Sequence, residues 1–188
     1  MKILSTLIIL LFSSSIIAEN ISDFAIEGIS VGDSLLNYKS ENEIINNIQD
    51  VFNYIEDDQF IQTGFFTSNS SEYDFIQINI KKNDLNYIVY GIGGVINPIN
   101  IDKCLPKLEQ VSNELTLLLK DFDKSSLNQI KHPVDNSGNS LVYQISFNLN
   151  DNVILVECYD FAENIQYPDS FAVMVFKDEL NRWLQLYQ

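Results

Sequence analysis

Apolar residues recur at three- and four-residue steps in several parts of the chain, the spacing that places them on one face of a helix. Ser40 and Glu43 form a capping-box pair, and the helical spacing continues over residues 44–52. A C-terminal helix is predicted over residues 177–188. Its predicted buried side chains are Leu180, Trp183 and Leu184.

The longest predicted helix begins near Asp102, which suits an N-cap position. Pro106 falls in its first turn, where a missing backbone N–H costs little. A regular apolar stripe then predicts one buried face. The stripe consists of Leu105, Leu108, Val111, Leu115, Leu118 and Phe122.

Alternating apolar and polar positions predict six strands. The Asn-Asp pair at 83–84 and the Asn-Asp-Asn run at 150–152 indicate hairpin turns. The polar segment 123–140 reads as a long loop, with room for one short element. Strands joined by tight turns pair antiparallel, so we expect an α+β fold with about six strands in one or two sheets and helices packed on one face. The strands are predicted at 60–67, 73–80, 85–95, 141–149, 153–159 and 171–176.

The first 18 residues have the pattern of a secretory signal peptide. Lys2 precedes an apolar run over residues 3–12, and three serines and Ala18 follow. A membrane-spanning helix is the alternative, but spanning needs about 20 predominantly apolar residues. We therefore expect cleavage after Ala18, no membrane span in the mature protein, and a single domain over residues 19–188. Glu19 follows the predicted cut, so lipid attachment through a cysteine is not expected.

Charge narrows the classes of partner. Lys2 is the one charged residue of segment 1–18, so the remainder carries 10 basic against 26 acidic side chains, a formal charge of −16. Such a field repels phosphate backbones and anionic lipid surfaces, which argues against nucleic acid and peripheral membrane binding. Solubility explains the acidity most simply, and a cationic ligand or partner stays open.

Cys104 and Cys158 are the only cysteines of the chain. In an oxidising compartment, such a pair is predicted to form a disulfide. The alternative is a free nucleophilic cysteine acting with His132, the single histidine. Neither cysteine lies in a C-x-x-C pair, so a thioredoxin-like role has no support.

The segment Gly-Asp-Ser-Leu at 32–35 resembles the signature of the GDSL (SGNH) serine hydrolases. The resemblance implies that Ser34 is the nucleophile and His132 the base. The family's carboxylate precedes its histidine by three residues, where this chain has Gln129, although Asp135 could act from the other side. The family's Gly-x-Asn-Asp block is also missing. A turn glycine followed by a helix cap explains the segment more simply.

Metal and cofactor sites are not predicted. One histidine and two oxidised cysteines do not make a zinc site. The run Asp-Asn-Ser-Gly-Asn at 135–139 begins like a calcium loop, but Ser140 and Ser146 occupy the positions of the required glycine and glutamate. We expect a solvated turn there and no cofactor.

Four of the tyrosines on predicted strands are candidates for ligand contacts. Tyrosine on an exposed sheet face could stack sugars or line a ligand groove, but packing within the sheet is the favoured interpretation. These residues are Tyr87, Tyr90, Tyr143 and Tyr159.

The opening Ile-x-Gly-Ile-Ser-x-Gly-Asp-Ser-Leu-Leu within segment 24–36, together with the Lys-x-Glu-Leu-x-x-Trp-Leu ending at 177–184, resembles a family of small exported proteins of unknown function from marine alphaproteobacteria. The resemblance implies a periplasmic or extracellular protein and supplies no activity. The favoured hypothesis is an exported, non-enzymatic domain that binds a protein or small-molecule partner. A serine esterase using Ser34 is the alternative, and an envelope-assembly accessory that offers an edge strand is a third possibility.

Overall fold

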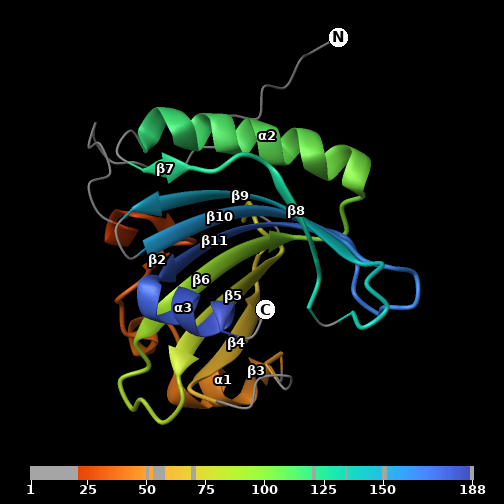
Figure 1. Cartoon of the computed structure of the whole chain (residues 1–188). Coiled ribbons are helices and arrows are strands. Elements are labelled where there is room, and N and C mark those ends of the chain that lie inside the picture. Colours follow the sequence, from red (N-terminus) through yellow and green to blue (C-terminus); the bar gives the residue numbers. More distant parts are fainter. Residues whose placement is uncertain are drawn as a thin grey trace.

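The computed structural model describes residues 21–49, 51–52, 58–68, 71–119, 122–133, 135–149 and 152–186. An α+β fold is confirmed: an antiparallel sheet with strand order β3-β4-β5-β6-β11-β10-β9-β7 carries β8 beside β9, and β1 and β2 form a separate hairpin (Figure 1). The elements in chain order are η1 (Ile21–Asp23), β1 (Ala25–Ile26), β2 (Ile29–Ser30), η2 (Leu35–Asn37), α1 (Glu41–Asn46), β3 (Ile48–Gln49), β4 (Phe60–Phe66), β5 (Phe75–Lys81), β6 (Val89–Ile96), α2 (Ile101–Leu118), β7 (Asp123–Lys124), β8 (Asn128–Lys131), β9 (Leu141–Leu149), β10 (Asn152–Asp160), β11 (Ser170–Lys177) and α3 (Asp178–Gln185).

The expected count of about six strands is too low, because the main sheet has nine. The six predicted strands are present as β4, β5, β6, β9, β10 and β11, and three short strands widen the sheet. β3 replaces the end of the first predicted helix, which stops at Asn46. β7 and β8 arise within the predicted loop 123–140 and pair with β9. All three lie at sheet edges, where exposed side chains leave no apolar alternation to detect.

The prediction that the helices share one face is wrong. Side chains of β10 alternate between two separate clusters: Ile154 and Val156 belong to the cluster that includes α2, and Val153 belongs to the cluster that includes α3. Neighbouring residues of a strand point to opposite faces, so α2 and α3 cover opposite faces of the sheet. We call these the α2 face and the α3 face.

The N-cap of helix α2 lies two residues before the predicted cap, Asp102. Asn100 is the N-cap, and its side chain accepts a hydrogen bond from the backbone N–H of Lys103. The predicted disulfide between Cys104 and Cys158 is confirmed, with 5.9 Å between the two Cα atoms. It joins the first turn of α2 to β10, and both cysteines are fully buried. The helix is therefore fixed covalently on the sheet at one end.

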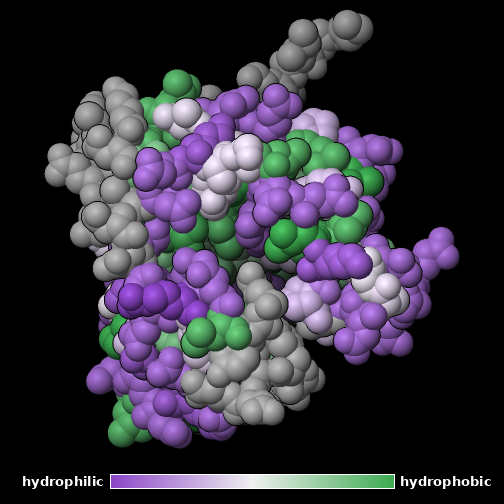
Figure 2. Space-filling model, in the orientation of Figure 1, coloured by the Kyte–Doolittle hydropathy of each residue, from purple (hydrophilic) through white to green (hydrophobic). Residues whose placement is uncertain are grey.

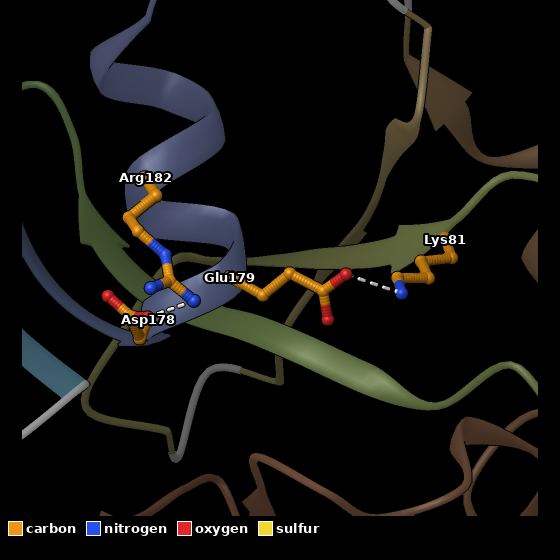
Figure 3. Close-up of polar contacts among 4 residues, drawn as sticks. All are labelled: Lys81, Asp178, Glu179 and Arg182. Atoms are coloured by element: carbon orange, nitrogen blue, oxygen red, sulfur yellow. Dashed lines mark ion pairs between the residues drawn. The ribbon is translucent and has the colours of Figure 1, made fainter.

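Helix α3 closes the other face with an aromatic core. Trp183 packs against Phe60 with 5.2 Å between ring centroids, and Leu180 is fully buried. Gly91 of β6 makes this approach possible, because a Cβ there would lie 2.5 Å from a methyl group of Leu180. Ion pairs fix the rim of this helix, as Figure 3 shows: Lys81 with Glu179 at 2.6 Å, and Arg182 with Asp178 at 2.5 Å.

The predicted signal peptide, residues 1–18, lies outside the described residues. Within the described part of the chain, no helix combines the length and the apolar character needed to cross a bilayer.

Candidate functional site

A groove of about 580 Å³ opens on the α2 face, between α2 and segment 124–127, which comprises the last residue of β7 and the link from β7 to β8. We call this segment the strap. Helix α2 and β7 run along the same side of the molecule in Figure 1, and the space-filling view of Figure 2 shows small groups of apolar side chains on a mainly hydrophilic face. The groove is lined by Leu105, Pro106, Leu108, Glu109, Ser112, Asn113, Lys124, Ser125, Ser126, Leu127 and Ile145.

The two walls of the groove are held in different ways. The α2 wall is fixed through the disulfide at Cys104 and through the buried stripe below it. The strap is held to β9 mainly by Ser125: its backbone N–H donates to the Ser146 carbonyl at 2.8 Å, and its Oγ accepts from the Ser146 N–H at 2.9 Å. Because Ser125 continues the pairing between β7 and β8, the strap stays close to the sheet while its side chains face the groove.

The apolar part of the lining is only partly covered. Leu108 and Ile145 are buried, but Leu127 is 53% exposed. An apolar floor with a partly exposed apolar wall and a few polar groups is typical of small-molecule sites, whose volumes run from about 300 to 1,000 Å³. The groove falls within that range.

Ser112 is the polar group in this lining that most needs a partner. Its side chain is 1% exposed, and its Oγ has no hydrogen-bond partner in the described structure. Leaving a buried hydroxyl unpaired costs about 1–3 kcal/mol. Its backbone carbonyl is used separately, accepting from Thr116 Oγ1 at 2.6 Å.

Thr116 connects Lys124 to the backbone of Ser112 through two hydrogen bonds. The Nζ of Lys124 donates to Thr116 Oγ1 at 3.0 Å and lies 5.6 Å from the centroid of the Phe147 ring. A lysine ammonium has three donors, so these contacts leave N–H groups for a further acceptor.

A second cavity on the α2 face is much smaller, about 40 Å³. It lies between α2 and the N-terminal segment that contains Phe24, with Lys107 and Glu114 among its lining residues. Such a volume admits no more than a few water molecules, so the groove by the strap is the better candidate.

The structure places Ser34 in a turn, as the cap residue of η2. Its Oγ donates to the Asn86 carbonyl at 2.6 Å, and its backbone bridges to Ile88. The neighbouring Asp33 accepts from the N–H of Ser30 and from the hydroxyl of Tyr38. These contacts give the segment a structural explanation without a nucleophile.

His132 lies at the opposite end of the sheet from Ser34. Its ring packs against Phe161, 5.0 Å between centroids, just beyond the end of β10. That end is level with Ile96 through Cys158 and Phe171, whereas Ser34 adjoins Ile88. Eight residues of strand separate the two levels, roughly 25 Å at about 3.3 Å per residue. The structure therefore does not bring Ser34 and His132 together.

Asp135 and Gln129, the residues considered as partners of His132, have other structural roles. Burial lowers the pKa of His132, and Asp135 opposes that shift. Asp135 instead organises its own turn: its carboxylate accepts from the Ser137 hydroxyl at 2.6 Å and from the backbone N–H groups of Ser137 and Ser140 at 2.8 and 2.7 Å. These hydrogen bonds, with that of the Ser137 hydroxyl first, hold the pKa of Asp135 well below its ordinary value. Gln129 is exposed on β8. The calcium-like run is thus a turn built around Asp135.

Sequence reasoning missed Glu157, which is buried at 5% exposure on the α3 face. Its two carboxylate oxygens accept from the Gln144 amide and the Tyr159 hydroxyl, each at 2.6 Å. Burial raises its pKa, and the two hydrogen bonds oppose the rise. The sequence does not show that a glutamate in the middle of a strand is buried unless the inward-facing positions of the strand are already known.

Among the described residues no group of three or more histidine, cysteine, aspartate or glutamate side chains could hold a metal ion.

The tyrosines on the predicted strands serve packing and hydrogen bonding. Tyr90 packs against Phe60 at 5.3 Å between centroids, and Lys81 and Lys177 lie over its ring. Tyr87, which lies before β6, donates to Glu41 at 3.0 Å. None of the tyrosines that the structure describes lines the groove.

No family model matches the chain, and comparisons with curated proteins and with solved structures give no match either. The resemblance based on segments 24–36 and 177–184 therefore stays a prediction.

Proposed function

We propose that this protein is an exported, non-enzymatic domain that binds a small molecule in the groove between α2 and the strap. The observation that carries the proposal is the groove itself, about 580 Å³ with an apolar floor and a buried hydroxyl that has no partner. A buried polar group without a partner is uncommon in folded proteins. Binding, and not catalysis, is the function that these residues support.

Export is part of the proposal. The disulfide between Cys104 and Cys158 supports it, because stable disulfides belong mainly to oxidising compartments. The pattern of residues 1–18 supports it independently. A periplasmic or extracellular domain with a formal charge of −16 would meet small solutes more readily than nucleic acid or anionic membrane.

The test uses a neutral apolar fluorescent probe, N-phenyl-1-naphthylamine, titrated into the mature protein. We expect saturable binding that is weakened at least tenfold by Leu127→Asp, because a carboxylate on the apolar wall must lose water when the probe binds. The matched control is Leu117→Asp. Leu117 is 75% exposed on α2 and does not line the groove.

Both variants replace an exposed leucine by aspartate and gain the same charge, so position is the difference between them. Equal weakening by the two substitutions, or the absence of saturable binding to the wild-type protein, would refute the groove as the site. Circular dichroism of both variants checks that neither substitution has disturbed the fold.

A further inference from the structure

The strap lies at a free edge of the sheet. Among the described strands, β7 and β8 each pair with β9 alone, so no further strand lies on their outer side. Helix α2 runs along this edge in Figure 1, and the groove separates the two. The groove therefore has a helix as one wall and the edge of a sheet as the other.

The strap has backbone donors that the fold does not use. Ser125 turns its N–H towards β9, where the Ser146 carbonyl accepts it at 2.8 Å. The next two backbone N–H groups, those of Ser126 and Leu127, donate to no group among the described residues. Both residues are exposed and line the groove, so a ligand can reach their backbone from that side.

Free backbone donors beside an apolar groove are suited to an extended peptide. Such a peptide adds a strand to the edge of a sheet: its main chain pairs with the edge, and alternate side chains enter the groove. Leu105, Leu108 and Ile145 give those side chains an apolar contact surface. At about 3.3 Å per residue, the strap spans roughly 13 Å, the length of a peptide segment of about four residues.

Two observations favour a short peptide over a second copy of this chain. Residues 125–127 lie opposite residues 145–146 of β9, between the pairs of Lys124 with Phe147 and of Asn128 with Gln144, so the strap is a bulge. A bulged edge opposes pairing with another sheet. Two mature copies would each carry a formal charge of −16 and repel each other, whereas a basic peptide is attracted.

We propose, on the basis of the function proposed above, that the ligand is a short basic peptide in extended conformation. Carbonyl groups of the peptide accept hydrogen bonds from the backbone N–H groups of Ser126 and Leu127. Alternate side chains of the peptide contact Leu105, Leu108 and Ile145. The strap fixes the backbone of the peptide, and the apolar floor selects its side chains.

The first test compares peptides by chemical-shift titration of isotope-labelled mature protein. The probe is the blocked pentapeptide acetyl-Lys-Val-Thr-Val-Lys-amide, with two N-methylated forms: one is methylated on both valine nitrogens, the other on the threonine and the last lysine. Alternate N–H groups of a strand point to the same side, so one form loses pairing with the strap and the other keeps it. We expect the two forms to differ in affinity by about fivefold or more. The acidic peptide acetyl-Glu-Val-Thr-Val-Glu-amide should bind more weakly than the basic one.

The second test uses a matched pair of variants. Ser126→Pro removes one backbone N–H of the strap, and Ser126→Ala keeps it. Proline is tolerated at a sheet edge where its missing N–H has no partner in the sheet. We expect Ser126→Pro to weaken the basic peptide about fivefold, the effect of one hydrogen bond, and Ser126→Ala to bind it as the wild type does. N-phenyl-1-naphthylamine should bind equally to both variants, because it needs no backbone donor.

Equal binding of the two methylated peptides would overturn the pairing with the strap, and so would equal binding of the peptide to two Ser126 variants that both retain the probe. If Ser126→Pro loses the probe, the methylated peptides alone decide. Tighter binding of the acidic peptide would overturn the proposed charge of the ligand. If no peptide binds while N-phenyl-1-naphthylamine still binds and Leu127→Asp still weakens it, the binding function stands and only the peptide is refuted. If the probe also fails, the binding function is refuted as well.

Discussion

Both faces of the sheet bury polar groups, and the two faces differ in the hydrogen-bond partners that these groups have. On the α3 face, Glu157 is paired with Gln144 and Tyr159, and the buried Gln62 donates to Gln49 at 2.9 Å. On the α2 face, the buried hydroxyl of Ser112 has no partner, and Ser112 is one of the residues around an open groove. A buried polar group that the protein already satisfies contributes to the fold, whereas one left unsatisfied costs free energy and calls for an explanation outside the packing of the fold.

The packing of the two faces explains where the groove can form. Helix α3 is short, and its Trp183 fills space above the sheet by packing against Phe60 of β4. Helix α2 is longer, but β7 and β8 widen the sheet beyond the strip that one helix can cover. The strap at 124–127 then forms a second wall at a distance from α2. The groove therefore forms because β7 and β8 extend the edge of the sheet further than α2 covers on its own face.

Removing the disulfide gives the largest expected effect, and it falls on the α2 face. Replacing Cys104 and Cys158 together by serine releases a cross-link with a sequence separation of 54 residues. On the chain-entropy account, the free energy of unfolding should fall by about 4 kcal/mol. Urea denaturation of the double variant and of the wild type measures the difference.

Probe binding by the double variant sharpens the comparison, because the helix that forms one wall is no longer fixed at its first turn. We expect weaker binding of N-phenyl-1-naphthylamine even where the variant is fully folded. If the free energy of unfolding of the double variant falls by less than about 1 kcal/mol, packing alone fixes α2, and the chain-entropy account is contradicted.

Glu157→Gln gives a smaller effect, on the α3 face, and one that depends on pH. Because burial raises the pKa of Glu157 above its ordinary value of 4.5, the folded state binds this proton more tightly than the unfolded state does. The free energy of unfolding of the wild type should therefore fall as pH rises above about 4.5, with a slope of at most about 1.4 kcal/mol per pH unit from this group. The variant has no proton to lose and keeps an acceptor for Tyr159.

The measurement is the difference between the two proteins in free energy of unfolding, from urea denaturation at pH 4.5 and pH 7. All other titrating groups are common to both and cancel in the difference. A difference that does not change with pH would show that Glu157 is not buried as the structure places it. Probe binding should be the same in both proteins, since Glu157 lies on the face away from the groove.

Much of this fold follows from the sequence, because long strands and an amphipathic helix carry strong periodic signals. The six long strands and the disulfide between Cys104 and Cys158 were predicted correctly. The short edge strands were not, since two- to four-residue polar segments pair only when β9 is there to receive them. The separation of the helices onto two faces was also missed, because periodicity shows that a helix has a buried side but not which face of the sheet it covers.

The groove could be predicted less well than the fold. The groove lies between α2 and the strap, and the sequence predicts a loop where the strap is. The GDSL-like segment indicated Ser34 as a candidate site residue instead. One signal was present: Ser112 stands four residues after Leu108 and three before Leu115, on the apolar stripe of the helix. A small polar residue inside such a stripe is either satisfied locally or available to a ligand, and only the structure shows which.

The most direct test of the binding site is amide NMR of isotope-labelled mature protein titrated with N-phenyl-1-naphthylamine. The account predicts that chemical-shift changes concentrate at residues 105–113, at the strap and around Ile145, and that the amides of Leu180 and Trp183 on the α3 face stay unchanged. Changes concentrated on the α3 face, or spread evenly over both faces, would contradict it.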